Sequence, residues 1–103
     1  MALFSIQTAP AAPAKPKRAR RVYENREFAA FARRIIRAFG RRIAAGDVEA
    51  LPELVQLQRD IDVIMGEAVK GLKAQGYSWA EIAARTGTSR QGAQQRWAKY
   101  VNA

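Results

Sequence analysis

Residues 89–99 carry side chains suited to hydrogen bonding with nucleic-acid bases and phosphates. Arginine can donate two hydrogen bonds to guanine, and glutamine can pair in the same bidentate way with adenine. A serine at the start of a helix can bind a phosphate, assisted by the free backbone N–H groups there. The candidate DNA-binding residues of this segment are Ser89, Arg90, Gln91, Gln94, Gln95 and Lys99.

The local sequence predicts a short helix over 78–87. Ser78 and Glu81 have the spacing of a capping box, which marks a helix start. Gly87 is expected to end the helix, because glycine adopts a left-handed backbone conformation at little cost. Its inner face is predicted to consist of Trp79, Ile82, Ala83 and Thr86.

A second helix is predicted over 89–101, capped by Thr88 or Ser89. Its inner stripe is expected at Ala93, Trp97 and either Tyr100 or Val101. Two short helices joined by a turn that contains glycine are typical of a helix-turn-helix.

These residues resemble the helix-turn-helices of sigma-factor region-4 type. The matching positions are Ile82-Ala83, Gly87, Ser89, Ala93, Arg96 and Trp97. The segment is also similar to small helix-turn-helix proteins of actinobacteria and their phages and plasmids, through Gly76 to Trp79, Arg90-Gln91 and Gln94 to Trp97. The resemblance implies that the second helix enters the major groove while the first braces it across the backbone. Thr86 replaces a usual leucine and Gly92 a commoner alanine, so packing and helix propensity should be weaker here.

A long amphipathic helix is predicted over 22–45. Its apolar face, expected to be core, consists of Phe28, Phe31, Ala32, Ile35, Phe39 and Ile43. The opposite face carries Arg26, Arg33, Arg34, Arg37, Arg41 and Arg42. These arginines are either solvated or in partial contact with a DNA backbone. Gly46 and Asp47 supply a stop and a possible cap.

A second long helix is predicted over 48–75, with Pro52 near its start, where a missing N–H costs little. Its apolar stripe is Leu54, Leu57, Ile61, Ile64, Met65, Ala68 and Leu72, widened by Val55 and Val69. Gly66 and Gly71 each weaken the helix by roughly 1 kcal/mol relative to alanine. They either let another helix approach closely or mark a bend. Gly76 is the expected stop.

Residues 1–21 are predicted to form a disordered arm, because three prolines interrupt residues 7–21. The basic end of the arm consists of Lys15, Lys17, Arg18, Arg20 and Arg21. It either lies along phosphates or in a minor groove, or is a solvated linker. The expected fold is therefore all-α: a helical domain over 22–103, with two long helices and a C-terminal helix-turn-helix behind the arm.

The charge distribution favours a polyanionic partner, usually nucleic acid and less often a membrane surface. Together with the helix-turn-helix pattern, it favours double-stranded DNA as the partner. The net charge is +9. Residues 1–46 hold 11 basic and 2 acidic residues, for a net of +9, and residues 82–103 hold 4 basic and none acidic, for +4. Residues 47–81 hold 3 basic and 7 acidic residues, for −4.

Composition argues against catalysis and against a metal or cofactor site. The chain has no cysteine and no histidine, which excludes thiolate and imidazole ligands and the commonest general base. Asp60 and Asp62 are two apart on a helix and do not share a face. No glycine-rich phosphate loop is visible. No apolar run approaches the ~20 residues needed to span a bilayer, so we expect a cytoplasmic, nucleoid-associated protein without a membrane partner.

Three functions fit these patterns. The leading hypothesis is a sequence-specific transcriptional regulator that forms a homodimer through its two long helices. An alternative is an architectural, nucleoid-type protein that binds many sequences through charge. A third hypothesis is an adaptor that recruits a protein partner through Met1–Ile6, with Leu3, Phe4 and Ile6 as anchors.

Overall fold

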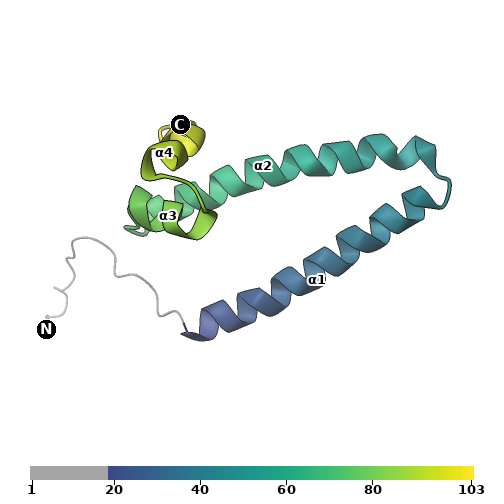
Figure 1. The fold of residues 1–103 in the computed structure, drawn as a ribbon, viewed down its shortest axis with the longest axis horizontal. Helices are drawn as coiled ribbons and strands as arrows, with labels where there is room; N and C mark the ends of the chain where they lie inside the picture. Colours follow the sequence, from purple (N-terminus) through teal and green to yellow (C-terminus); the bar gives the residue numbers. More distant parts are fainter. Residues whose placement is uncertain (1–18) are drawn as a thin grey trace, which may run out of the picture. The chain divides into compact units, whose positions relative to one another are not determined.

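The structure, a computed structural model, describes residues 19–103, with side-chain exposure from residue 24 onward. This part of the chain is helical and contains no strand, which confirms the all-α class. The elements are α1 (Ala19–Ala44), the 3-10 turn η2 (Val48–Ala50), α2 (Leu51–Ala74), α3 (Trp79–Thr86) and α4 (Arg90–Val101) (Figure 1). The chain divides into two compact units. We call residues 19–63 the N-terminal unit and residues 64–103 the C-terminal unit.

Helix α1 begins at Ala19, three residues before the predicted start. The prediction that Arg20 and Arg21 belong to the arm is therefore wrong. The last proline is Pro16, and alanine and arginine are good helix formers, so nothing opposes helix at these positions. The rest of the predicted arm, including Lys15, Lys17 and Arg18, lies outside the described residues.

The connection between α1 and α2 is built on a glycine with a positive φ. Gly46 has φ 130, and the amides of Gly46 and Asp47 both donate to the Ile43 carbonyl at 3.0 Å. The predicted second helix then starts as the turn η2, and α2 proper begins at Leu51. Pro52 occupies its second position, where no N–H is required.

The apolar face of α1 is exposed in the single chain. Phe28, Phe31 and Ile35 are 71%, 50% and 57% exposed. The prediction that this face forms a core is wrong for these three residues and for Ala32, whereas Phe39 and Ile43 are half-buried. α1 and the first part of α2 leave the turn as two diverging arms (Figure 1). Helical periodicity identifies an apolar face but not what covers it.

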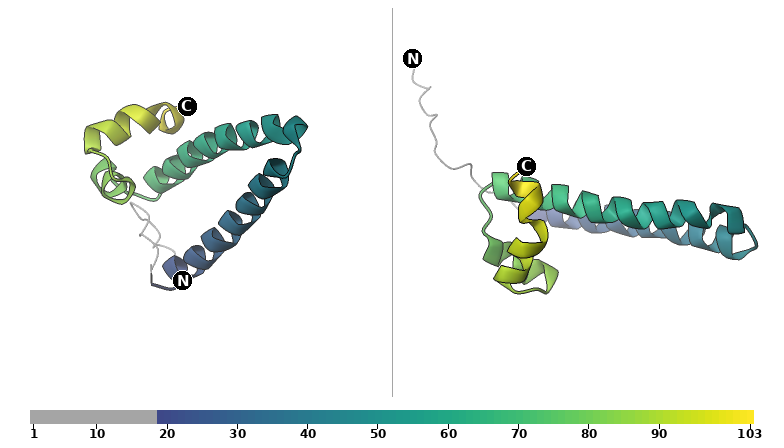
Figure 2. Two further views of the ribbon diagram at one scale, coloured as in Figure 1. Left: turned by 45° about the vertical axis from the view of Figure 1, so that its right-hand side comes forward. Right: turned by 90° about the horizontal axis from the view of Figure 1, so that it is seen from above.

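The core of the C-terminal unit is small and comes from three helices. Its buried side chains are Val69 of α2, Ile82 and Ala83 of α3, and Ala93 and Trp97 of α4. Four half-buried residues pack against them, namely Tyr77, Trp79, Tyr100 and Val101. The inner stripes predicted for the two short helices are confirmed, with one exception. Figure 2 shows α3 and α4 side by side in both views.

The exception is Thr86, which was expected on the inner face of α3 but is exposed. Its hydroxyl donates to the Ile82 carbonyl at 3.1 Å. A threonine at this position therefore satisfies a carbonyl of the last helical turn instead of filling the core as a leucine would.

The ends of α2 and α3 are fixed by local hydrogen bonds. After α2, the amide of Tyr77 donates to Leu72 at 3.1 Å and that of Gly76 to Lys73 at 3.0 Å, which is the Schellman pattern. Ser78 and Glu81 form the predicted capping box: each side chain accepts from the other residue's amide, at 3.1 Å and 2.9 Å.

Gly87 ends α3 in the left-handed conformation, with φ 72. We expect Gly87→Ala to lower the free energy of unfolding by about 1–2 kcal/mol, because Cβ disfavours this conformation. Gly87→Asn is the matched control and should cost less, since asparagine adopts left-handed φ more readily. Chemical denaturation of both variants measures the difference. Equal losses would mean that the backbone conformation is not the cause.

Gly66 lets the end of α4 approach α2 closely. A Cβ built at Gly66 would lie 2.5 Å from Cε2 of Tyr100, well inside normal contact. At Gly71, by contrast, a Cβ would meet nothing within 4 Å. Of the two explanations that the sequence left open, close approach of another helix applies to Gly66.

Candidate nucleic-acid interface

Helix α4 presents its predicted DNA-binding side chains to solvent. Arg90, Gln91, Gln94, Gln95 and Lys99 are all exposed. Their spacing places them in two neighbouring rows along the helix, one with Arg90 and Gln94 and one with Gln91, Gln95 and Lys99. The structure thus exposes all five on one helix: Gln91, Gln95 and Lys99 lie opposite the buried stripe, whereas Arg90 and Gln94 lie beside it.

The orientation of this exposed face is set by the inner face of the same helix. Ala93 is 0% exposed and Trp97 is 2% exposed, one helical turn apart. Any rotation of α4 about its axis would bring one of these side chains out of the core. The exposed rows are therefore held by packing rather than by contacts of their own.

Ser89 is the N-cap of α4. Its hydroxyl oxygen accepts from the Gly92 amide at 2.9 Å, and the first intrahelical bond runs from the Ala93 amide to the Ser89 carbonyl at 2.9 Å. The amides of Arg90 and Gln91 precede both of these bonds. They lie at the positive end of the helix dipole, where an anion is favoured. From the sequence, Ser89 was predicted to bind a phosphate. In the structure its hydroxyl oxygen accepts the capping hydrogen bond from the Gly92 amide.

Gly92 occupies a tight position beside this cap. A Cβ there would lie 3.1 Å from the Ser89 hydroxyl oxygen. Gly92, which stands where the motifs that this segment resembles more often have alanine, therefore fits the cap geometry, although it lowers helix propensity.

The C-terminal unit carries cations around α4 that the candidate set omits. Arg85 and Arg96 are exposed as well, and residues 82–103 contain no acidic side chain. The guanidinium of Arg96 lies 5.0 Å from the Trp97 ring centroid, and the ammonium of Lys99 lies 5.3 Å from that of Tyr100. Arg85 and Arg96 could have been identified from the sequence by their position in a segment without acidic residues.

Other kinds of site are not found in residues 19–103. No group of acidic side chains there could hold a metal ion, and none of these helices is long and apolar enough to cross a membrane. The predicted protein-docking segment Met1–Ile6 lies outside this range.

Comparison with known proteins gives no relative: no family model matches the chain, and no curated protein or solved structure is significantly similar to it.

Proposed function

We propose that this protein binds double-stranded DNA, with α3 and α4 acting as a helix-turn-helix and α4 reading the major groove. The observation that carries the proposal is the exposed double row on α4. Arginine and glutamine side chains project from a helix whose inner face is locked in a core. Such a rigid helix is the element that major-groove readers use. The role that follows is sequence-specific transcriptional regulation.

Each part of the interface has a distinct task in this proposal. Arg90 pairs with guanine, and Gln91 and Gln94 pair with adenine. Lys99, farther along the helix, contacts the phosphate backbone, as do the first amides of α4. The acid-free character of residues 82–103 supports this assignment, because a carboxylate there would repel the phosphates.

The decisive experiment begins with selection of a binding site from a random duplex library at roughly physiological salt. We expect Arg90→Ala to weaken binding to the selected site by ~1–3 kcal/mol and to relax the base preference at one position. Arg37→Ala is the matched control, since it removes the same charge from an exposed position on α1 in the other unit. Fluorescence anisotropy on the selected and scrambled duplexes measures both affinities.

The outcome separates specific from non-specific binding. An enriched motif, with a loss for Arg90→Ala far above that for Arg37→Ala, supports the specific reader. Equal, small losses for the two variants contradict it. Failure of the full chain to bind any duplex, even at low salt, contradicts DNA binding altogether.

A second candidate function is charge-driven architectural binding of DNA in the nucleoid. It is favoured by the exposed arginine face of α1, which consists of Arg26, Arg33, Arg34, Arg37, Arg41 and Arg42. In this case binding would show no enriched motif and a steep dependence on salt concentration.

A further inference from the structure

We infer that the N-terminal unit is a dimerisation module in which α1 of one copy packs against residues 47–63 of a second copy. The inference concerns a surface that the proposed DNA interface does not use. It rests on the exposed apolar area of the unit, on the width of the apolar surface of α2, and on the opposite charges of α1 and residues 47–63.

Large apolar side chains are exposed on both helices of the N-terminal unit. Eight large apolar side chains of the unit are at least two-fifths exposed: Phe28, Phe31, Ile35, Val48, Leu51, Val55, Ile61 and Val63. Their exposed fractions amount to about four whole side chains. A standard protein interface takes about 800 Å² from each partner.

The apolar surface of α2 is too wide for one neighbouring helix. Leu57, Leu54, Leu51 and Val55 together span about half the helix circumference at 3.6 residues per turn. An apolar stripe that faces a core is roughly 100° wide. The half-buried pair Leu54 and Leu57 accounts for one side. The other side, at Leu51 and Val55, is 47% and 41% exposed.

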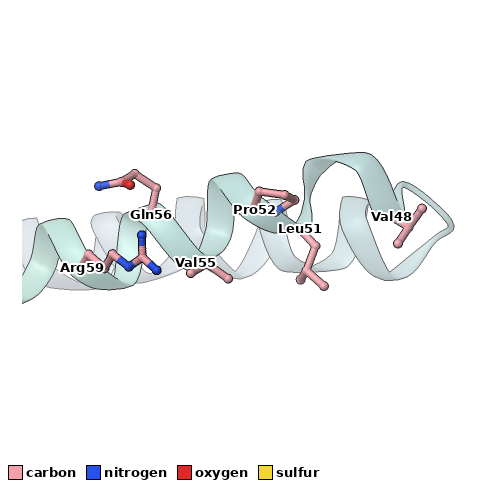
Figure 3. Close-up of a pocket in the computed structure, with 6 residues that line it drawn as sticks. All are labelled: Val48, Leu51, Pro52, Val55, Gln56 and Arg59. Carbon is pink, nitrogen blue, oxygen red and sulfur yellow. The ribbon is translucent and has the colours of Figure 1, made fainter.

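That other side forms an open hollow at the start of α2. It is lined by Val48, Leu51, Pro52, Val55, Gln56 and Arg59 (Figure 3). The figure shows Val48, Leu51 and Val55 projecting from one side of the helix, with Gln56 projecting from the other. An apolar helix face such as that of Phe28, Phe31 and Ile35 has the chemistry to fill this hollow.

Charge favours a second copy as the occupant, with α1 of one copy against residues 47–63 of the other. α1 carries eight arginines and two glutamates, for a net of +6. Residues 47–63 carry five acidic side chains and one arginine, for a net of −4. Contact between two α1 helices would bring like charges together, whereas α1 against residues 47–63 of the partner brings opposite charges together. In a dimer with two-fold symmetry, this favourable contact forms twice.

Charge reversal in the full-length protein tests the pairing. The acidic-α1 variant carries Arg34→Glu and Arg42→Glu. Although Arg34 was assigned to the arginine face, its guanidinium lies 5.8 Å from the Phe31 ring centroid and so reaches the edge of the apolar face. The basic-α2 variant carries Asp62→Lys, on the same side of α2 as Leu51 and Val55. Light scattering and sedimentation give the mass of each variant and of their equimolar mixture, and circular dichroism reports helix content.

We expect the unaltered chain to be a dimer and each variant alone to dimerise about tenfold or more weakly, with helix content retained. Mixing the two variants should restore a heterodimer, because both contacts again join opposite charges. Undiminished dimerisation of the acidic-α1 variant would overturn the pairing. A monomeric wild-type chain at tens of micromolar would overturn the proposal itself and leave the face for a different partner.

Phe28→Ser is the variant that tests the apolar contact without charge. Phe28 is 71% exposed, so its loss removes little packing from the single chain. We expect a shift to monomer with unchanged helix content. An unchanged dimer would exclude this face from the interface. These readouts need no DNA, so their failure and the failure of the DNA-binding proposal are separate results.

Discussion

Trp97→Ala is expected to abolish the folded structure of α3 and α4. Trp97 is 2% exposed and is the largest of only five buried side chains in the C-terminal unit. Truncating a buried tryptophan costs about 3–5 kcal/mol. A core this small supplies little more than about 3–5 kcal/mol of net stability. The loss should therefore equal or exceed what holds the unit together.

Circular dichroism and amide hydrogen exchange over residues 79–101 measure this effect. Trp79→Ala is the matched control, since Trp79 is the same residue type but half-buried, at the edge of the core beneath Lys73. Its loss should be smaller, because part of the ring is already in water. If Trp97→Ala retained protected amides in α4, or cost no more than Trp79→Ala, Trp97 would not be the centre of the core.

Gly66→Ala is expected to destabilise the C-terminal unit by about 1–3 kcal/mol, the usual cost of overpacking. The added methyl group would occupy the space of the Tyr100 ring, and α4 or its tyrosine must move. Gly71→Ala lies in the same helix with open space around it, so it should stabilise the protein by about 1 kcal/mol through helix propensity alone. The two substitutions are expected to change the free energy of unfolding in opposite directions, although both replace glycine with alanine.

Chemical denaturation measures the change in stability for each variant. A double substitution shows whether the Tyr100 ring is the cause of the loss. Tyr100→Ala removes the ring, so Gly66→Ala in that background should become neutral or stabilising. If Gly66→Ala remains destabilising without the tyrosine, the clash with α4 is not the reason. If the two glycines behave alike in the wild-type background, the close approach of α4 to α2 is absent in solution.

The local features of the C-terminal unit could be predicted from the sequence because each depends on neighbouring residues. A capping box requires only Ser78 and Glu81 at the right spacing, and a left-handed stop requires only Gly87. The exposed positions of Gln91 and Gln95 follow from the burial of Ala93 and Trp97, since a helix with one face inward has the other outward.

Features that depend on distant residues could not be predicted in this way. The sequence offered two explanations for Gly66, and the Tyr100 ring that decides between them lies far along the chain. Periodicity showed that Phe28 and Ile35 share an apolar face, but a core face and an interface face have the same pattern. The start of α1 was misplaced because a run of arginines reads equally well as a charged tail or as a helix.

The core of the C-terminal unit is built from elements that follow one another directly along the chain. Val69, Ile82 and Trp97 meet after only short turns, so little loop-closure entropy is lost when they come together. Helical domains with such local contacts fold in microseconds to milliseconds. If α4 frays or opens in the cell, it should therefore re-form quickly, and such brief unfolding leaves little time for proteolysis or aggregation.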